Sequence, residues 1–147
     1  MKKHYLFLMK TNQLYGAERR ILSIFSRVDY SAYSITLAVC NKDVFVPYVK
    51  NNKLAIELTN LPSHSDTNGI VKKIWRFYKF FRENSPDVIV FSQFYLTSFS
   101  LAELLAGLLV TKGNNYMIVH DSGLHYKKYK SRLHFAIFPG IGLQWRL

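Results

Sequence analysis

The chain has 147 residues, of which 49% are hydrophobic and 16% aromatic, so it can fill one core, is too short for two ordinary domains and is not disordered. Its 20 Lys and Arg against 9 Asp and Glu give a net charge of +11, which favours an anionic partner such as a phosphorylated ligand, a lipid surface or a nucleic acid. The single cysteine, Cys40, excludes an internal disulfide, and we expect it to be a small buried strand residue.

Strand patterns and helix patterns alternate along the first half of the chain. Short apolar and β-branched runs predict strands, and apolar residues at helical spacing predict helices. The elements expected there are a strand at 5–11, a helix at 17–28, a strand at 34–40, a short helix within 41–53 and a strand at 54–61. A turn with the sequence LYGAERR, 14–20, joins the first strand to the first helix.

The second half continues the alternation. A basic, aromatic helix at 70–84 is stopped by Ser85 and Pro86, and a buried strand, an apolar helix and a further strand follow. We expect these last three elements at 87–93, 98–110 and 116–120. Pro139, Gly140 and Gly142 interrupt the tail at 133–147, so we expect neither a helix nor a sixth strand there.

This order of elements predicts the fold class. Strands that alternate with helices form parallel βαβ units with right-handed crossovers, which place helices on both faces of one sheet. We therefore predict a single domain over 1–147 with a doubly wound, mostly parallel, Rossmann-like α/β sheet in three layers. Ligands of such sheets bind outside the carboxyl ends of the strands. Gly16, Gln93 and His120 each follow or end a predicted strand, so we expect them at one shared edge.

The turn at Gly16 has two interpretations. The N–H groups at a helix start can bind an anion, and glycine lets a phosphate approach the backbone. One glycine is equally compatible with an ordinary strand-to-helix connection. Glu18 has its own simple explanation, because an acidic residue stabilises the first turn of a helix.

An ordered series of short motifs carries a family resemblance. The first strand, the turn with Gly16, Ala17 and Glu18, and the strand YSITL are followed by SPDVIVFSQ at 85–93 and MIVHDSG at 117–123. The series resembles the amino-terminal domain of glycosyltransferase family four over roughly 5–125. The resemblance implies a retaining transferase of the GT-B type, in which two Rossmann-like domains close on a nucleotide-sugar donor. It implies a glycan or lipid-linked acceptor, with no catalytic metal and no cofactor besides the nucleotide sugar.

The resemblance also implies roles for individual residues. Gly16 and Ala17 would approach the donor diphosphate, and His120 would be the catalytic residue that orients the transferred sugar. The supporting residues would be Glu18, Gln93 and Asp121. Tyr15 stands where relatives commonly have the first of two adjacent glycines. We expect the carboxy-terminal nucleotide-sugar domain to be absent from this chain, which would then be a fragment, a truncated product or half of a split enzyme, inactive alone.

Basic and aromatic residues gather in two segments, 70–84 and 125–134. They are either the solvated sides of packed elements or a surface for an anionic membrane or acceptor. The residues concerned are Lys72, Arg76, Lys79, Lys127, Lys128 and Lys130. No nucleic-acid module accompanies them, so nucleic acid is not an expected partner. We expect a cytoplasmic protein, peripheral on the inner face of the membrane.

Two functions from different classes remain open on the sequence. The first is the acceptor-side half of a glycosyltransferase. The second is a noncatalytic Rossmann-like module that binds an anionic ligand, a membrane surface or a partner subunit. Glu103, alone in an apolar helix, is either exposed or paired.

Overall fold

The computed structural model describes residues 2–62, 69–93, 101–111, 114–119 and 141–143. Six strands lie in this part of the chain: β1 (Lys3–Met9), β2 (Tyr33–Val39), β3 (Glu57–Asn60), β4 (Val88–Gln93), β5 (Asn115–Val119) and β6 (Ile141–Leu143). The helices among the same residues are α1 (Gly16–Phe25), α2 (Val46–Asn51), α3 (Ile70–Asn84) and α4 (Leu101–Thr111), with the short 3-10 helix η1 (Lys42–Val44) before α2.

The strands form one sheet in the order β3-β2-β1-β4-β5-β6, and every neighbouring pair is parallel. This order is that of a doubly wound nucleotide-binding sheet. The chain leaves β1 towards β2 on one side and returns from β3 to β4 on the other side. The predicted Rossmann-like α/β fold is therefore confirmed.

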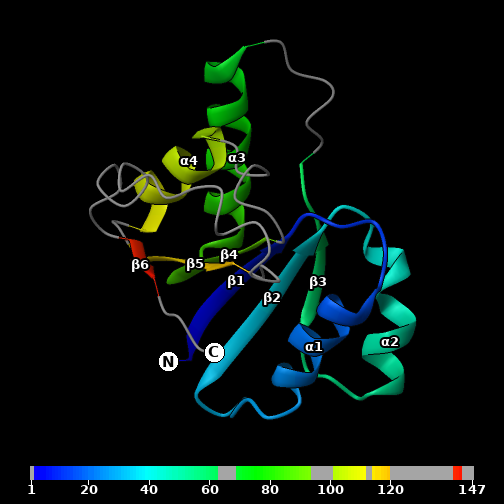
Figure 1. Ribbon diagram of the computed structural model, residues 1–147. Helices are drawn as coiled ribbons and strands as arrows, with labels where there is room; N and C mark the ends of the chain where they lie inside the picture. Colours follow the sequence, from blue (N-terminus) through cyan, green and yellow to red (C-terminus); the bar gives the residue numbers. More distant parts are fainter. Residues whose placement is uncertain (1, 63–68, 94–100, 112–113, 120–140, 144–147) are drawn as a thin grey trace, which may run out of the picture.

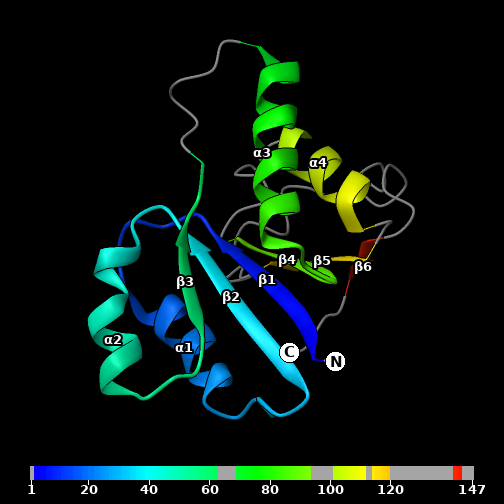
Figure 2. The same ribbon diagram turned by 180° about the vertical axis from the view of Figure 1, so that it is seen from behind.

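Helices cover both faces of the sheet, as Figures 1 and 2 show. On one face α1 and α2 pack over a core that includes Met9, Phe25 and Phe45. On the other face α3 and α4 pack over a core that includes Leu8 and Phe81. Successive residues of β1 thus enter opposite cores, because side chains alternate along a strand. The three layers follow from this alternation.

Helix α3 has the bounds that its sequence pattern predicts. Phe77, Phe80 and Phe81 are buried against the sheet and α4. Ser85 ends the helix in the left-handed conformation, with φ at 44°, and its N–H donates to the carbonyls of Phe81 and Arg82. Pro86 follows and cannot continue the helix, so the chain turns into β4.

Two of the differences from the predicted elements concern the tail and the third strand. The tail does contain a strand: β6 pairs with β5 in parallel, with Gly142 beside Tyr116, so the expectation of no sixth strand was wrong. An edge strand pairs with only one neighbour, so it tolerates glycine and proline residues that a central strand would not. The third strand is shorter than predicted, because Lys53 turns the chain at φ 50° and Leu54 packs into the core under α1 and α2.

Replacing Phe81 with alanine should destabilise the protein by about 3–5 kcal/mol, because the ring is fully buried and its removal leaves a cavity. Trp75→Ala is the matched control on the same helix. The Trp75 side chain is 65% exposed, so its loss should cost under about 1 kcal/mol. Urea unfolding measures both changes, and equal costs would contradict the described orientation of α3.

Candidate functional site

The strand order defines a switch point between β1 and β4. Here neighbouring parallel strands continue in opposite directions across the sheet, and doubly wound folds bind ligands at the carboxyl edge beside this point. The register places Met9 of β1 beside Ser92 of β4, and Gln93 of β4 beside Val119 of β5. The carboxyl ends of the three strands therefore lie next to one another.

Gly16 is the first residue of α1, in the connection that leaves this edge from β1. A Cβ atom built on Gly16 would meet nothing within 4 Å, and Gly16 is not among the residues with positive φ. The fold itself therefore does not require glycine here. A glycine would matter only where something from outside approaches the backbone closely. Ala17 is the next residue of α1.

Glu18 occupies the amino end of the same helix. Its carboxylate Oε2 accepts a hydrogen bond from the Tyr15 N–H at 3.0 Å, and its side chain is only 3% exposed. A carboxylate at this position is stabilised by the helix dipole. It also brings negative charge to the place where an incoming phosphate would bind, so Glu18 acts as a helix cap in this structure.

Gln93 is the last residue of β4, in line with the other strand ends. His120 and Asp121, which follow β5, lie outside the described residues, as do Lys127, Lys128 and Lys130. The predicted convergence of Gly16 and Gln93 on one edge is visible in the topology. The roles assigned to all these residues stay predictions.

A buried ion pair lies at the same edge. Lys10 directly follows β1, and its Nζ is 2.8 Å from Oε1 of Glu103, the third residue of α4. Glu103 is fully buried, so it is paired rather than exposed. No local sequence pattern singles out Lys10. A lone carboxylate in an otherwise apolar helix was the signal that a cation from elsewhere must reach it.

Cys40 follows the last residue of β2 beside this pair. Its N–H donates to the carbonyl of Thr11 at 3.3 Å, which ties the ends of β1 and β2 together. The residue is exposed, so the expectation of a buried cysteine was wrong. Partial burial of the sulfur raises the pKa of the Cys40 thiol, Lys10 lowers that pKa, and Glu103 raises it.

The basic residues predicted on α3 lie along its outer side. Lys72 and Lys79 are exposed and Arg76 is half-buried. Val71 and Trp75 are 75% and 65% exposed. Val71, Trp75 and Lys79 follow one another at four-residue spacing and so share one face. We call this the α3 outer face, made of Val71, Lys72, Trp75, Lys79 and Arg82.

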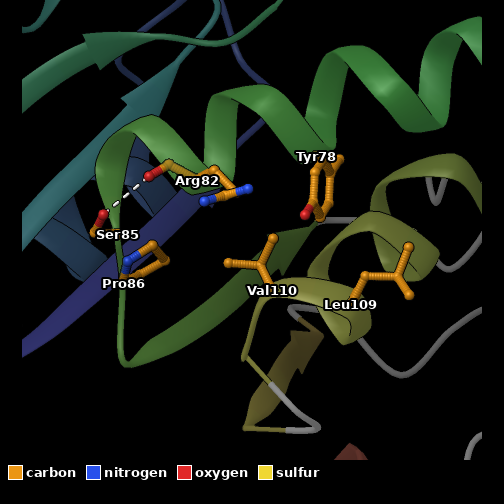
Figure 3. A pocket seen from close by; sticks show the side chains of 6 residues that line it. All are labelled: Tyr78, Arg82, Ser85, Pro86, Leu109 and Val110. Carbon is orange, nitrogen blue, oxygen red and sulfur yellow. Dashed lines mark hydrogen bonds between the residues drawn. The ribbon is translucent and has the colours of Figure 1, made fainter.

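A shallow pocket of about 300 Å³ lies between the carboxyl ends of α3 and α4 (Figure 3). It is lined by Tyr78, Arg82, Ser85, Pro86, Leu109 and Val110. The Arg82 guanidinium lies 5.9 Å from the centre of the Tyr78 ring. Because Pro86 precedes β4, the pocket is at the amino edge of the sheet, opposite the switch point. It is therefore separate from the predicted site.

The described residues contain neither a cluster of metal ligands nor a helix suited to crossing a membrane. No group of three or more His, Cys, Asp or Glu side chains in this part of the chain could hold a metal ion. None of the described helices combines the length and the apolar character that crossing a membrane requires.

Comparisons with known proteins give similarity in structure. No family model matches the sequence, and a search of curated proteins gives no match. A glycosyltransferase from Rickettsia africae ESF-5 superposes with a TM-score of 0.53 at 14% identity, covering 90% of this chain and 34% of that chain. A UDP-N-acetylglucosamine 2-epimerase gives a TM-score of 0.47 at 13% identity, covering 90% of this chain and 38% of that chain. The first similarity shows a shared fold, so this chain has the fold of about a third of a glycosyltransferase.

The Cys40 thiol should react with iodoacetamide at a higher pH than the thiol of a short unstructured peptide, because its pKa is raised in the folded protein. Only the thiolate reacts, so the rate at pH 8 should be lower than for the peptide. Cys40 is the single cysteine, so the modified fraction reports this site alone. The two profiles should coincide after unfolding in urea. Coinciding profiles in the folded protein would contradict the described surroundings of Cys40.

Proposed function

We propose that this chain is the acceptor-side domain of a retaining glycosyltransferase of the GT-B type, related to family four. The parent reaction would move a sugar from a nucleotide-diphosphate donor to a glycan or lipid-linked acceptor. The observation that carries the proposal is the sheet order β3-β2-β1-β4-β5-β6, with α1 beginning at Gly16 beside the switch point. The fold shared with a glycosyltransferase supports it.

Under this proposal the amino end of α1 faces the donor diphosphate. Negative charge develops on the leaving diphosphate during transfer, so N–H groups at a helix start stabilise the transition state more than the ground state. Gly16 and Ala17 would supply these groups, and His120 would orient the sugar. A second domain would supply most of the contacts to the nucleotide, and catalysis would need both domains.

The proposed acceptor side includes the α3 outer face. Figures 1 and 2 show the amino end of α3 projecting past the sheet. Exposed Val71 and Trp75 lie among Lys72 and Lys79, and this combination suits the headgroup region of an anionic membrane. The net charge of +11 favours the same partner. We therefore propose a peripheral protein on the cytoplasmic face of a membrane that carries the acceptor.

One observation favours the noncatalytic alternative. The Glu18 carboxylate already accepts the Tyr15 N–H at the start of α1, which lowers the affinity of this helix end for a second anion. A module that binds a membrane or a partner subunit would not need a phosphate there. Binding to anionic vesicles without binding to nucleotides would favour this alternative.

Gly16→Val should weaken the binding of UDP and ADP by at least about tenfold, measured by calorimetry, because the new side chain would stand between the ligand and the helix start. The fold should tolerate the change, since a Cβ at this position has open space. Ser23→Val is the matched control, because it adds the same side chain to an exposed position of α1. If the parent protein binds neither nucleotide, the noncatalytic function is favoured. Unchanged binding in Gly16→Val would remove the turn from the site.

Reversing two charges on the α3 outer face, Lys72→Glu with Lys79→Glu, should reduce binding to vesicles rich in phosphatidylglycerol by at least about tenfold. Sedimentation with vesicles measures the change, and vesicles of neutral lipid should bind weakly throughout. The control is Lys50→Glu with Lys53→Glu, the same charge change on exposed residues at the end of α2. An equal loss in both variants would show an effect of net charge and contradict a defined surface.

A further inference from the structure

The ion pair between Lys10 and Glu103 joins two elements that are distant in sequence. The Lys10 Nζ lies 2.8 Å from Glu103 Oε1, with the Lys10 side chain 18% exposed and the Glu103 side chain 0% exposed. Lys10 comes from the end of the central strand, and Glu103 comes from the first turn of α4. The carboxylate therefore lies inside, and the lysine is the member of the pair that reaches the surface.

Stability alone does not explain this arrangement. Taking two charges out of water is costly, and two well-packed apolar side chains commonly serve a core equally well. Around Glu103 the packed side of α4 is apolar, with Ala102, Leu104 and Ala106 buried beside it. A carboxylate held there fixes the position of the lysine ammonium. Such an arrangement fits a site that needs a cation at one defined point.

Lys10 lies at the edge of the sheet where a ligand is expected to bind. Leu6 and Leu8 of β1 enter the core under α3 and α4. Side chains alternate along a strand, so Lys10, two residues after Leu8, lies on the same face of the sheet. The strand ends beside it belong to β2 and β4, so Lys10 stands at the carboxyl edge next to the switch point. It lies on the α4 side of the sheet, whereas α1 lies on the other side.

We propose that Lys10, held in place by Glu103, binds a phosphate group of the ligand at the α4 side of the carboxyl edge. Lysine binds phosphate as a point charge, and the ligand meets the ammonium before the carboxylate behind it. This inference rests on the proposed function, in which two phosphates are available: the donor diphosphate and the phosphate of a lipid-linked acceptor. Glu103 is a positioning residue in this site, and Lys10 is the residue that touches the ligand.

The alkylation rate of the Cys40 thiol can report on a phosphate bound at Lys10. A purely structural ion pair would leave this rate unchanged when the ligand is added. The charges of both Lys10 and Glu103 act on its thiol, and the residue is exposed to a reagent. A phosphate bound at Lys10 adds negative charge nearby, which should raise the pKa of the thiol and slow its alkylation by iodoacetamide at pH 8 at least about threefold.

The test compares UDP with geranyl phosphate, which carry the donor-type and acceptor-type phosphate. The variants are Lys10→Met together with Glu103→Leu, which replaces the pair by apolar residues and should fold, and Lys10→Arg, which keeps the charge. Lys42→Met, an exposed lysine beyond the end of β2, is the control. We expect at least one ligand to bind and to slow Cys40 alkylation. The double replacement should weaken that binding at least about tenfold, Lys42→Met should leave it unchanged, and Lys10→Arg should restore most of it.

The outcomes separate this inference from the proposed function. If UDP binds equally to the parent protein and the double replacement, and geranyl phosphate does the same or does not bind, the inference is overturned and the donor site stands. If geranyl phosphate alone binds, and does so through Lys10, the inference stands and the donor role of α1 fails. If neither ligand binds to the parent protein, the inference is overturned and the proposed function is not, because a second domain would supply most of the contacts to the nucleotide.

Discussion

The parallel pairing of β1 with β2 on one side and with β4 on the other determines most other features of this fold. Met9 is in register with both Val39 and Ser92, so β1 lies inside the sheet and both of its faces are buried. Right-handed crossovers to the two sides then put α1 and α3 on opposite faces. The same pairing creates the switch point, and the carboxyl edge beside it collects residues from α1, α4 and three strands.

Two buried carboxylates, those of Glu18 and Glu103, lie at this edge and have different roles. Each belongs to the third residue of a helix. Glu18 caps its own helix through the Tyr15 N–H. Glu103 reaches a cation of another element and couples α4 to the end of β1. Both gain from the dipole of their helices. The close seating of α4 depends on Gly107, where a Cβ would lie 3.2 Å from Cζ of Phe91. This seating brings Glu103 within reach of Lys10.

Helix α3 serves the core and the surface with different sides of one amphipathic pattern. Its phenylalanines fill the space between the sheet and α4, and they are the reason the helix lies where it does. Its outer face is left with apolar Val71 and Trp75 among lysines. A packed helix needs only one apolar stripe, so Val71 and Trp75 lie outside the part of α3 that fills the core. The pocket at the other end of the helix lies at the amino edge, away from the strand ends that define the candidate site.

The sequence alone predicts the order of the elements and the fold class, because apolar spacing is local. Helix α3 has the predicted bounds, and β1, β2 and β4 lie within a few residues of theirs. The sequence also located Gly16 at the start of α1 and Gln93 at a strand end. Three further features follow from tertiary contacts: β6 completes the sheet, Trp75 and Cys40 are exposed, and Lys10 pairs with Glu103. Exposure and pairing depend on which elements cover a residue. That is set by contacts between segments far apart in the sequence, as with Lys10 and Glu103, and no local pattern encodes it.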